Sequence, residues 1–164
     1  MLTLGIDPGL ATTGYGVVKE ENNKLTLVDY GCVLTSKSEE TCSRLNTLAK
    51  GIESLIKKYD PDAVAVEELF FASNAKTAIK VGEARGVILL TASQTGVDIA
   101  EYTPLQVKQA LTGYGRAEKH QIQYMVQKIL GCKEIPKPDD AADALAIAIC
   151  HINSQKLNKA VNKK

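Results

Sequence analysis

The first third of the chain has the hydrophobic patterning of short β-strands. An apolar run over residues 2–7 ends at Asp7, and two further β-rich segments cover residues 14–20 and 25–35. The polar stretch Glu21-Asn22-Asn23-Lys24 separates the last two, and turn-forming residues in that place are typical of a hairpin. The pattern therefore predicts three consecutive strands.

The rest of the chain alternates between helical and strand periodicity. Helical faces are predicted within residues 45–56, which Pro61 terminates, and 73–95, and strands over residues 63–66 and 97–102. Three more helices follow: one opening at Thr103-Pro104, one around residues 122–130, and one opening at Pro138-Asp139. This order predicts an α/β fold with a mixed five-stranded sheet and helices on both faces.

Length and composition fit one globular domain. The chain has 164 residues, of which 45% are hydrophobic and 24% charged. We expect a single domain over residues 1–153 and a polar, lysine-rich tail over residues 154–164 that frays. The sequence has neither an apolar stretch long enough for a bilayer nor the pattern of a signal peptide. Its four cysteines lack CxxC spacing, so we expect reduced thiols in a cytoplasmic protein.

Charge is distributed unevenly along the chain. Residues 1–70 carry seven basic and eleven acidic side chains, whereas residues 71–164 carry thirteen and eight. A basic excess in the second half allows a polyanionic partner on one face. A solubilising surface would explain the same excess, so charge alone does not decide the function.

Four acidic residues lie at the ends of predicted elements. Asp7 and Glu67 each end an apolar strand, and Asp140 and Asp143 share one side of the first turn of the last helix. Carboxylates brought together in this way repel one another unless a cation neutralises them. Mg²⁺ prefers such oxygen ligands together with a substrate phosphate. A pair of these ions can clamp the attacking and leaving oxygens of a phosphodiester.

Each of these acids also has an ordinary interpretation. An aspartate near a helix start is commonly a cap, and Asp7 beside Pro8-Gly9 fits a turn. Asp139 shares a helix face with Asp143 as well. Strand alternation does not choose between Glu67 and Glu68 as the inward-facing residue.

The segment from Gly5 to Gly14 fits two kinds of phosphate chemistry. It matches a strand–turn–strand that presents a metal-binding aspartate in nucleases of the ribonuclease H type. It also resembles the first phosphate-binding loop of actin-like ATPases and sugar kinases, in which backbone N–H groups surround a phosphate. Those ATPases need two such domains and a much longer chain, which favours the nuclease.

Several motifs together closely resemble the RuvC-type Holliday-junction resolvases, in the order and spacing of that family. The likeness covers about residues 1–153. The motifs are Gly5-Ile6-Asp7-Pro8-Gly9, Thr13-Gly14-Tyr15-Gly16, Val66-Glu67-Glu68-Leu69-Phe70, Asn74-Ala75, Gly82-Glu83-Ala84-Arg85-Gly86-Val87, Gln106-Val107-Lys108-Gln109, Gly115-Arg116-Ala117-Glu118-Lys119 and Asp140-Ala141-Ala142-Asp143-Ala144-Leu145-Ala146.

This resemblance implies a ribonuclease H-like fold and a homodimeric endonuclease that makes paired, symmetric nicks across a four-way DNA junction. It implies a metal-binding set of Asp7, Glu67, Asp140 and Asp143, with two Mg²⁺ ions that Mn²⁺ can replace, and 5′-phosphate products. We hypothesise that Lys119 stabilises charge on the phosphate in the transition state. The family also implies docking on the RuvAB branch-migration complex, for which no motif is visible here.

The resemblance also indicates residues that contact DNA. Phe70 matches an aromatic residue that stacks on a junction base, and Lys108 and Lys119 match basic residues near the cleaved strand. The full set of expected DNA contacts is Phe70, Asn74, Arg85, Lys108, Arg116 and Lys119.

Two small residues suggest where a second subunit packs. Gly82 and Gly86 lie one turn apart in the predicted helix over residues 73–95, where each costs about 1 kcal/mol relative to alanine. We therefore expect this helix to form much of a dimer interface. Two other functions stay open: a junction-binding module without catalysis, and a ribonuclease H-like nuclease for branched RNA or pre-rRNA.

Overall fold

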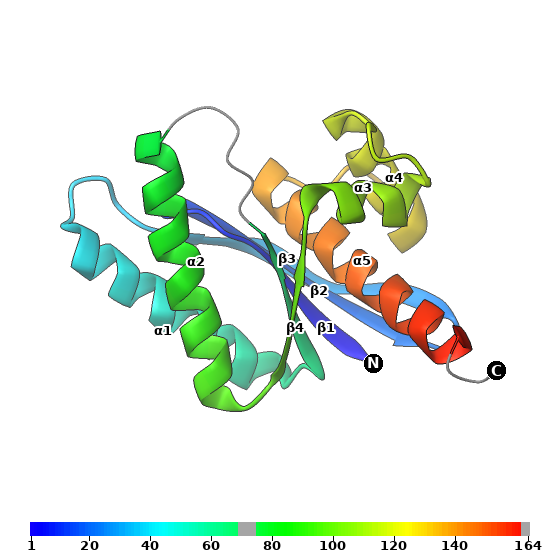
Figure 1. Ribbon diagram of the computed structural model, residues 1–164, viewed down its shortest axis with the longest axis horizontal. Coiled ribbons are helices and arrows are strands. Elements are labelled where there is room, and N and C mark those ends of the chain that lie inside the picture. Colours follow the sequence, from blue (N-terminus) through cyan, green and yellow to red (C-terminus); the bar gives the residue numbers. More distant parts are fainter. Residues whose placement is uncertain (69–74, 162–164) are drawn as a thin grey trace.

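The protein, a computed structural model, is described here over residues 1–68 and 75–161, and its elements follow the order expected from the sequence (Figure 1). Every predicted strand and helix is confirmed in type and approximate position. They are β1 (Leu2–Asp7), β2 (Thr12–Glu21), β3 (Lys24–Leu34), α1 (Thr41–Tyr59), β4 (Ala63–Glu67), α2 (Ala75–Thr95), β5 (Asp98–Tyr102), α3 (Pro104–Thr112), α4 (Lys119–Leu130) and α5 (Asp139–Val161).

The five strands form one mixed sheet in the order β3-β2-β1-β4-β5. β1, β2 and β3 pair antiparallel, whereas β4 pairs parallel with β1 and β5 pairs parallel with β4. Asn22 and Asn23 take positive φ angles of 51° and 64° in the turn between β2 and β3, as asparagine does in hairpins. The predicted meander and mixed sheet are thus confirmed.

Helices cover both faces of the sheet, and a separate apolar core fills each side. α1 and α2 lie over one face, and α5 lies over the other with α3 and α4 beside it (Figure 1). Leu4 and Ile6 of β1 point into the first core, where they meet Ile52 and Ile88. The second core is built around α5, which contributes a nearly continuous buried run over residues 144–150.

α5 lies unusually close to the sheet because β1 and β2 present glycines to it. A Cβ atom on Gly14 would be 1.9 Å from the carbonyl oxygen of Asp140, and one on Gly5 would be 2.1 Å from that of Ala144. These distances are far below van der Waals contact, so side chains at either position would push the helix away. The first turn of α5 is thereby held against the end of β1.

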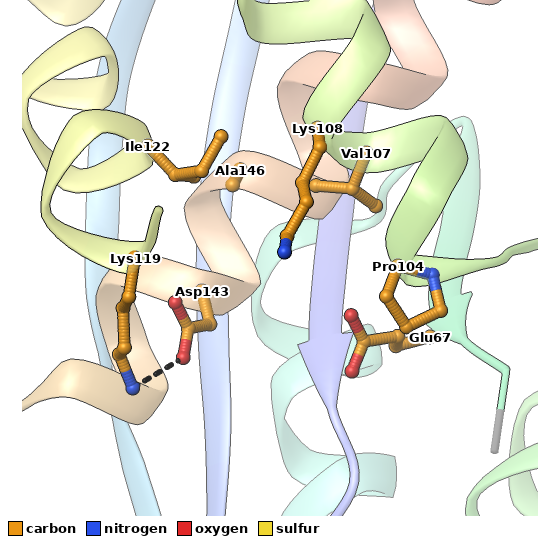
Figure 2. A pocket seen from close by; sticks show the side chains of 8 residues that line it. All are labelled: Glu67, Pro104, Val107, Lys108, Lys119, Ile122, Asp143 and Ala146. Carbon is orange, nitrogen blue, oxygen red and sulfur yellow. Dashed lines mark ion pairs between the residues drawn. The ribbon is translucent and has the colours of Figure 1, made fainter. Parts of the chain in front are cut away.

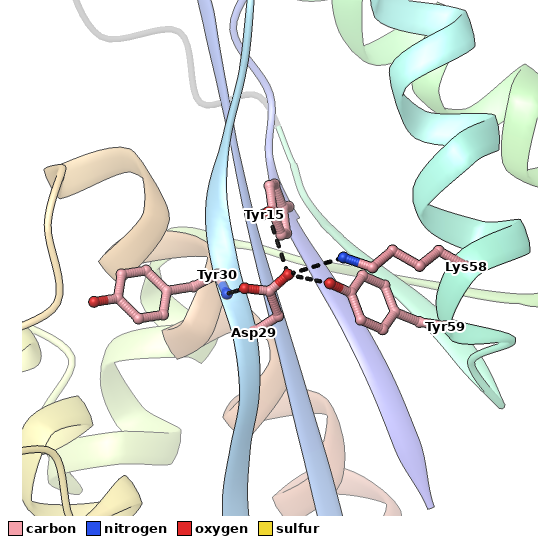
Figure 3. Close-up of polar contacts among 5 residues, drawn as sticks. All are labelled: Tyr15, Asp29, Tyr30, Lys58 and Tyr59. Atoms are coloured by element: carbon pink, nitrogen blue, oxygen red, sulfur yellow. Dashed lines mark hydrogen bonds and ion pairs between the residues drawn. The ribbon is translucent and has the colours of Figure 1, made fainter.

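A polar network fastens α1 to the other face of the meander (Figure 3). The Asp29 carboxylate of β3 accepts hydrogen bonds from the hydroxyl of Tyr59, the Tyr30 N–H at 2.9 Å and the Tyr15 hydroxyl at 3.5 Å. Lys58 adds an ion pair at 3.5 Å. The Tyr59 hydrogen bond is the main reason that the pKa of Asp29 falls below its usual value, against the opposing effect of burial.

The end of the chain differs from the expectation of a frayed tail from residue 154. α5 continues to Val161, because its last turns find partners: Ser154 donates to the Cys150 carbonyl at 2.9 Å, and Lys156 pairs with Glu20 at 3.4 Å. None of the described helices combines the length and the hydrophobicity needed to cross a membrane.

Replacing Gly14 by alanine tests whether the close approach of α5 is required. We expect Gly14→Ala to destabilise the protein by about 1–3 kcal/mol, because the new Cβ meets backbone that must move. Gly31→Ala is the matched control, since the three atoms nearest its Cβ all belong to the Tyr15 side chain, the nearest at 2.9 Å, and a side chain gives way more easily than backbone. Thermal unfolding of both variants is the measurement, and equal costs for the two would contradict the interpretation.

Candidate metal centre

Asp7 and Glu67 end neighbouring parallel strands. Ile6 of β1 pairs with Val66 of β4, so the two carboxylates follow at the same end of the sheet. Glu67 lines a pocket beside this edge and its charge acts on Asp7, whereas Glu68 does not line that pocket. Of the two adjacent glutamates, Glu67 is therefore the one that belongs to the site.

The first turn of α5 brings two more carboxylates to the same place. The backbone of Asp140 lies against Gly14, whose strand partner is Asp7. Asp143, one turn further on, lines the same pocket as Glu67. The four carboxylates predicted from the sequence thus meet at one edge, contributed by three elements that are distant in sequence.

Burial and mutual repulsion change how these acids titrate. Burial is the main cause that raises the pKa of Asp7 from 3.8 to about 8, and the negative charges of Glu67, Asp143 and Asp140 add to it. Burial and then the charge of Asp143 raise the pKa of Glu67 from 4.5 to about 7. Burial also raises the pKa of Asp143. Without a cation, the group therefore holds protons near neutral pH.

Lys119, the first residue of α4, supplies a positive charge to this group. Its ammonium lies 3.0 Å from Asp143 Oδ2 (Figure 2). It also lies 3.4 Å from Asp139 Oδ2. Partial burial on its own would lower the pKa of Lys119, but the hydrogen bonds and charges of Asp143 and Asp139 outweigh it and raise that pKa. Lys119 consequently stays protonated while the acids around it titrate.

The pocket itself lies between α3, α4, α5 and the end of β4. Lys108 of α3 extends into it toward Glu67 and Asp143 (Figure 2). Its positive charge acts to lower the pKa of Glu67, although burial and Asp143 dominate. The full lining is Glu67, Pro104, Val107, Lys108, Lys119, Ile122, Asp143 and Ala146.

The donors fit a hard divalent cation. All four acids offer oxygen, the ligand type that Mg²⁺ and Mn²⁺ take. Burial and then neighbouring negative charges raise the pKa values of Asp7, Glu67 and Asp143, and a bound cation would favour their charged forms. Within residues 1–68 and 75–161, no three acidic, histidine or cysteine side chains are already gathered as a closed ligand set. Of the four acids, Asp143 is paired with Lys119.

The remaining predicted DNA contacts divide into three groups. Phe70 and Asn74 lie outside the described residues. Arg116 is exposed in the segment between α3 and α4. Arg85 forms an ion pair with Glu101 of β5, so its guanidinium joins α2 to the sheet and lies apart from the pocket. We therefore leave Arg85 out of the DNA-binding residues proposed below.

Other titratable residues have structural explanations. His151 is buried, and its Nδ1 lies 3.0 Å from the Tyr102 hydroxyl. His120 is exposed and faces Glu118 at 3.3 Å. All four cysteines are free, as expected. Sequence analysis missed the part played by Asp139, which shares Lys119 with Asp143; the i,i+4 spacing of the two aspartates was the available signal.

Comparison with known proteins places this geometry in one family. The family model for "Crossover junction endodeoxyribonuclease RuvC" matches residues 3–151. The RuvC of Desulfitobacterium hafniense is 59% identical over 157 residues, which cover 96% of this chain and 95% of that protein. The structure of Thermus thermophilus RuvC superposes with a TM-score of 0.88 at 40% identity, covering 96% of this chain and 97% of that one. T. thermophilus RuvC in complex with a Holliday junction substrate gives a TM-score of 0.87 at 39% identity, covering 96% of each chain.

The electrostatic cost of Asp7 is measurable in the metal-free protein. Because its pKa is raised from 3.8 to about 8, the folded state loses stability as pH rises through that interval. Asp7→Asn removes the titration, so we expect it to stabilise the protein by on the order of 2–5 kcal/mol at pH 8 and by little at pH 4.

The measurement is denaturant unfolding in EDTA at a series of pH values. Exposed Glu134→Gln, which also removes one negative charge, serves as the control and should leave the pH profile unchanged. An Asp7→Asn advantage that is equal at pH 4 and pH 8 would refute the electrostatic explanation.

Proposed function

This chain belongs to the RuvC family of crossover junction endodeoxyribonucleases, and we propose that it resolves four-way DNA junctions in recombination and repair by paired, symmetric nicks. The observation that carries the proposal is the convergence of Asp7, Glu67, Asp140 and Asp143 at one edge of the sheet, between lysines suited to a phosphate backbone. The relative from T. thermophilus, similar over 96% of this chain, is known in complex with a Holliday junction substrate.

The four carboxylates would hold two Mg²⁺ ions, which Mn²⁺ can replace. When bound, such ions make a water molecule more acidic and stabilise the departing 3′ oxygen, which gives 5′-phosphate and 3′-hydroxyl products. The partly buried position of Asp7 at the end of β1 supports its role as the central ligand, because the charges of all three other acids act on its carboxylate.

The two lysines of the pocket act on the phosphate. Lys119 is anchored by Asp143 and Asp139 and keeps its charge at neutral pH, so it stabilises negative charge that builds up on the phosphate in the transition state. Lys108 approaches from α3 on the opposite side and positions the cleaved strand. Arg116 is an additional contact to the backbone from the neighbouring exposed segment. Stacking by Phe70 and a contact from Asn74 stay predictions.

Paired nicks need two copies of this site, and one face of α2 is suited to join them. Ile79 and Leu90 are exposed, at 64% and 59%, and a Cβ on Gly86 between them would meet nothing within 4 Å. The buried face of α2 is a different one, formed by Ala84, Ile88 and Ala92. A second chain packing on the exposed face would bury the apolar residues and use the small side chain at Gly86.

The cellular setting follows from the family and from the thiols. Four free cysteines are in keeping with a reducing cytoplasm. Docking on the RuvAB branch-migration complex is part of the proposal and rests on family membership alone.

Cleavage of a mobile four-way junction with Mg²⁺ tests the activity directly. We expect paired symmetric nicks from the wild-type protein, and a loss on the order of 10³-fold or more for Asp7→Asn, because cation stabilisation of the transition state is worth several kcal/mol. Junction binding by Asp7→Asn should be retained, since removing a negative charge does not weaken phosphate contacts.

Linear duplex, RNA–DNA hybrid and branched RNA are the companion substrates. Preferential cutting of RNA would indicate a different ribonuclease H-like nuclease. Tight binding without cutting by the wild type, over a range of Mg²⁺ and Mn²⁺ and several junction sequences, would instead make the protein a junction-binding module.

The proposed dimer face is tested by Gly86→Arg. A large charged side chain there should weaken self-association at least about tenfold, because it places an unpaired charge in an apolar contact. Sedimentation analysis measures the effect, with Leu157→Arg as the control at an exposed apolar residue of α5, 67% exposed. A Gly86→Arg protein that remains as dimeric as the control would remove α2 from the interface.

A further inference from the structure

A second pocket is lined in part by Asp140, which does not line the Lys108–Lys119 pocket. It is formed by the turn between β1 and β2, the start of α1 and the first half of α2, and we call it the Arg44 pocket. Its lining includes Gly9–Thr12, Lys37, Arg44, Lys80 and Asp140. We propose that the Arg44 pocket binds a backbone phosphate of the cleaved DNA strand, next to the phosphate that is cut; this inference rests on the function proposed above.

Arg44 carries the strongest part of the argument. Only 7% of this residue is exposed, although it bears a permanent positive charge. Its Nε donates a 3.0 Å hydrogen bond to Thr35 Oγ1, which fixes the guanidinium plane. Among the ion pairs formed by residues 1–68 and 75–161, none involves Arg44. A buried guanidinium without a carboxylate is costly unless an anion completes it.

No carboxylate of the described residues forms an ion pair with Arg44. Residues 69–74 and 162–164 contain neither aspartate nor glutamate, so no acidic side chain is left out of this comparison. Glu39 and Glu40 precede Arg44 on the chain, but both are exposed and neither lines the pocket. Asp140 does line the pocket, but it forms no ion pair with Arg44 and belongs to the proposed metal-binding acids. An anion from outside the protein is therefore suited to complete the site.

The surroundings favour phosphate. Lys37 and Lys80 bring two further positive charges from different elements, and both are exposed. The Thr35 hydroxyl donates a hydrogen bond to the Leu10 carbonyl, and the Thr35 N–H donates one to the Ala11 carbonyl, so Thr35 holds the turn between β1 and β2 in place. These two carbonyl oxygens are thereby already hydrogen-bonded within the protein. A rigid fork of guanidinium donors beside lysines is the arrangement that recognises phosphate oxygens.

The position of Asp140 indicates which phosphate of the DNA strand would reach Arg44. This residue belongs to the metal-binding acids and also lines the Arg44 pocket, whereas Asp143, one helical turn away, lines the pocket with Lys119. A strand whose scissile phosphate lies at the acids thus brings a neighbouring phosphate to Arg44. Because the partner is the sugar–phosphate backbone, the contact positions the strand without reading its sequence.

The test compares binding of an uncleaved junction in EDTA by the wild type, Arg44→Gln and Lys37→Gln. Glutamine can keep the hydrogen bond to Thr35 while losing the charge. Lys50→Gln, at an exposed position of α1 outside the pocket, is the matched control. We expect about tenfold weaker binding for Arg44→Gln, about twofold for Lys37→Gln, and a slope of log K against log salt that is smaller by about one for Arg44→Gln.

A methylphosphonate scan identifies the phosphate. Junctions carrying one neutral linkage at successive positions around the cut site are bound to each protein. A neutral linkage at one position within a few nucleotides of the cut should weaken binding by the wild type. The same linkage should have no further effect on Arg44→Gln, because that variant already lacks the guanidinium that pairs with the phosphate charge.

The outcomes separate this inference from the function on which it rests. Wild-type binding that is insensitive at every flanking position, or equally sensitive in Arg44→Gln, overturns the phosphate site even if junctions are cut normally. If both pocket variants bind the junction with the affinity and the salt dependence of the wild type, the phosphate site is overturned too. Lys37→Gln provides this test on its own should Arg44→Gln fold poorly. A wild-type protein that binds no junction at all contradicts the proposed function first.

Discussion

The contact of α5 with the glycines of β1 and β2 is the constraint on which the site depends. With no side chain at Gly14, the first turn of the helix reaches the end of β1, and Asp140 and Asp143 arrive beside Asp7. Parallel pairing of β1 with β4 adds Glu67 at the same edge. β1, β4 and α5 thus bring four carboxylates together, and the position of each carboxylate depends on how these three elements pack.

Such a concentration of negative charge shapes its surroundings. Lys108 and Lys119 line one pocket with Glu67 and Asp143, and Lys37, Arg44 and Lys80 line another with Asp140. The sequence is nearly neutral overall, with a formal charge of +1, so this local order matters more than net charge. Two cationic pockets that both include acids of a partly buried group are suited to a polyanion whose reacting phosphate lies at those acids.

Hydrophobic periodicity and helix-start residues predicted all ten elements because both are local signals in the sequence, but such signals could not decide contacts between distant segments. Strand alternation left Glu67 and Glu68 open; the family resemblance indicated Glu67, and the structure places Glu67 in the lining of the pocket beside β4. Arg44 was missed, although it shares a buried helix face with Leu48 and Ile52 at four-residue spacing. A charged residue on an otherwise apolar face was the available signal, yet only the folded structure shows that no carboxylate pairs with it.

The acids proposed to bind metal lower the stability of the folded protein. Asp7, Glu67 and Asp143 all have raised pKa values because burial and mutual repulsion disfavour their charged forms. A protein under selection for stability alone would replace such residues, so their presence marks a place where function outweighs stability. Any cation or phosphate that binds the folded state raises its free energy of unfolding by mass action, which offsets part of the stability lost to these acids. The same side chains therefore determine both the binding of cation and phosphate and the stability of the folded protein.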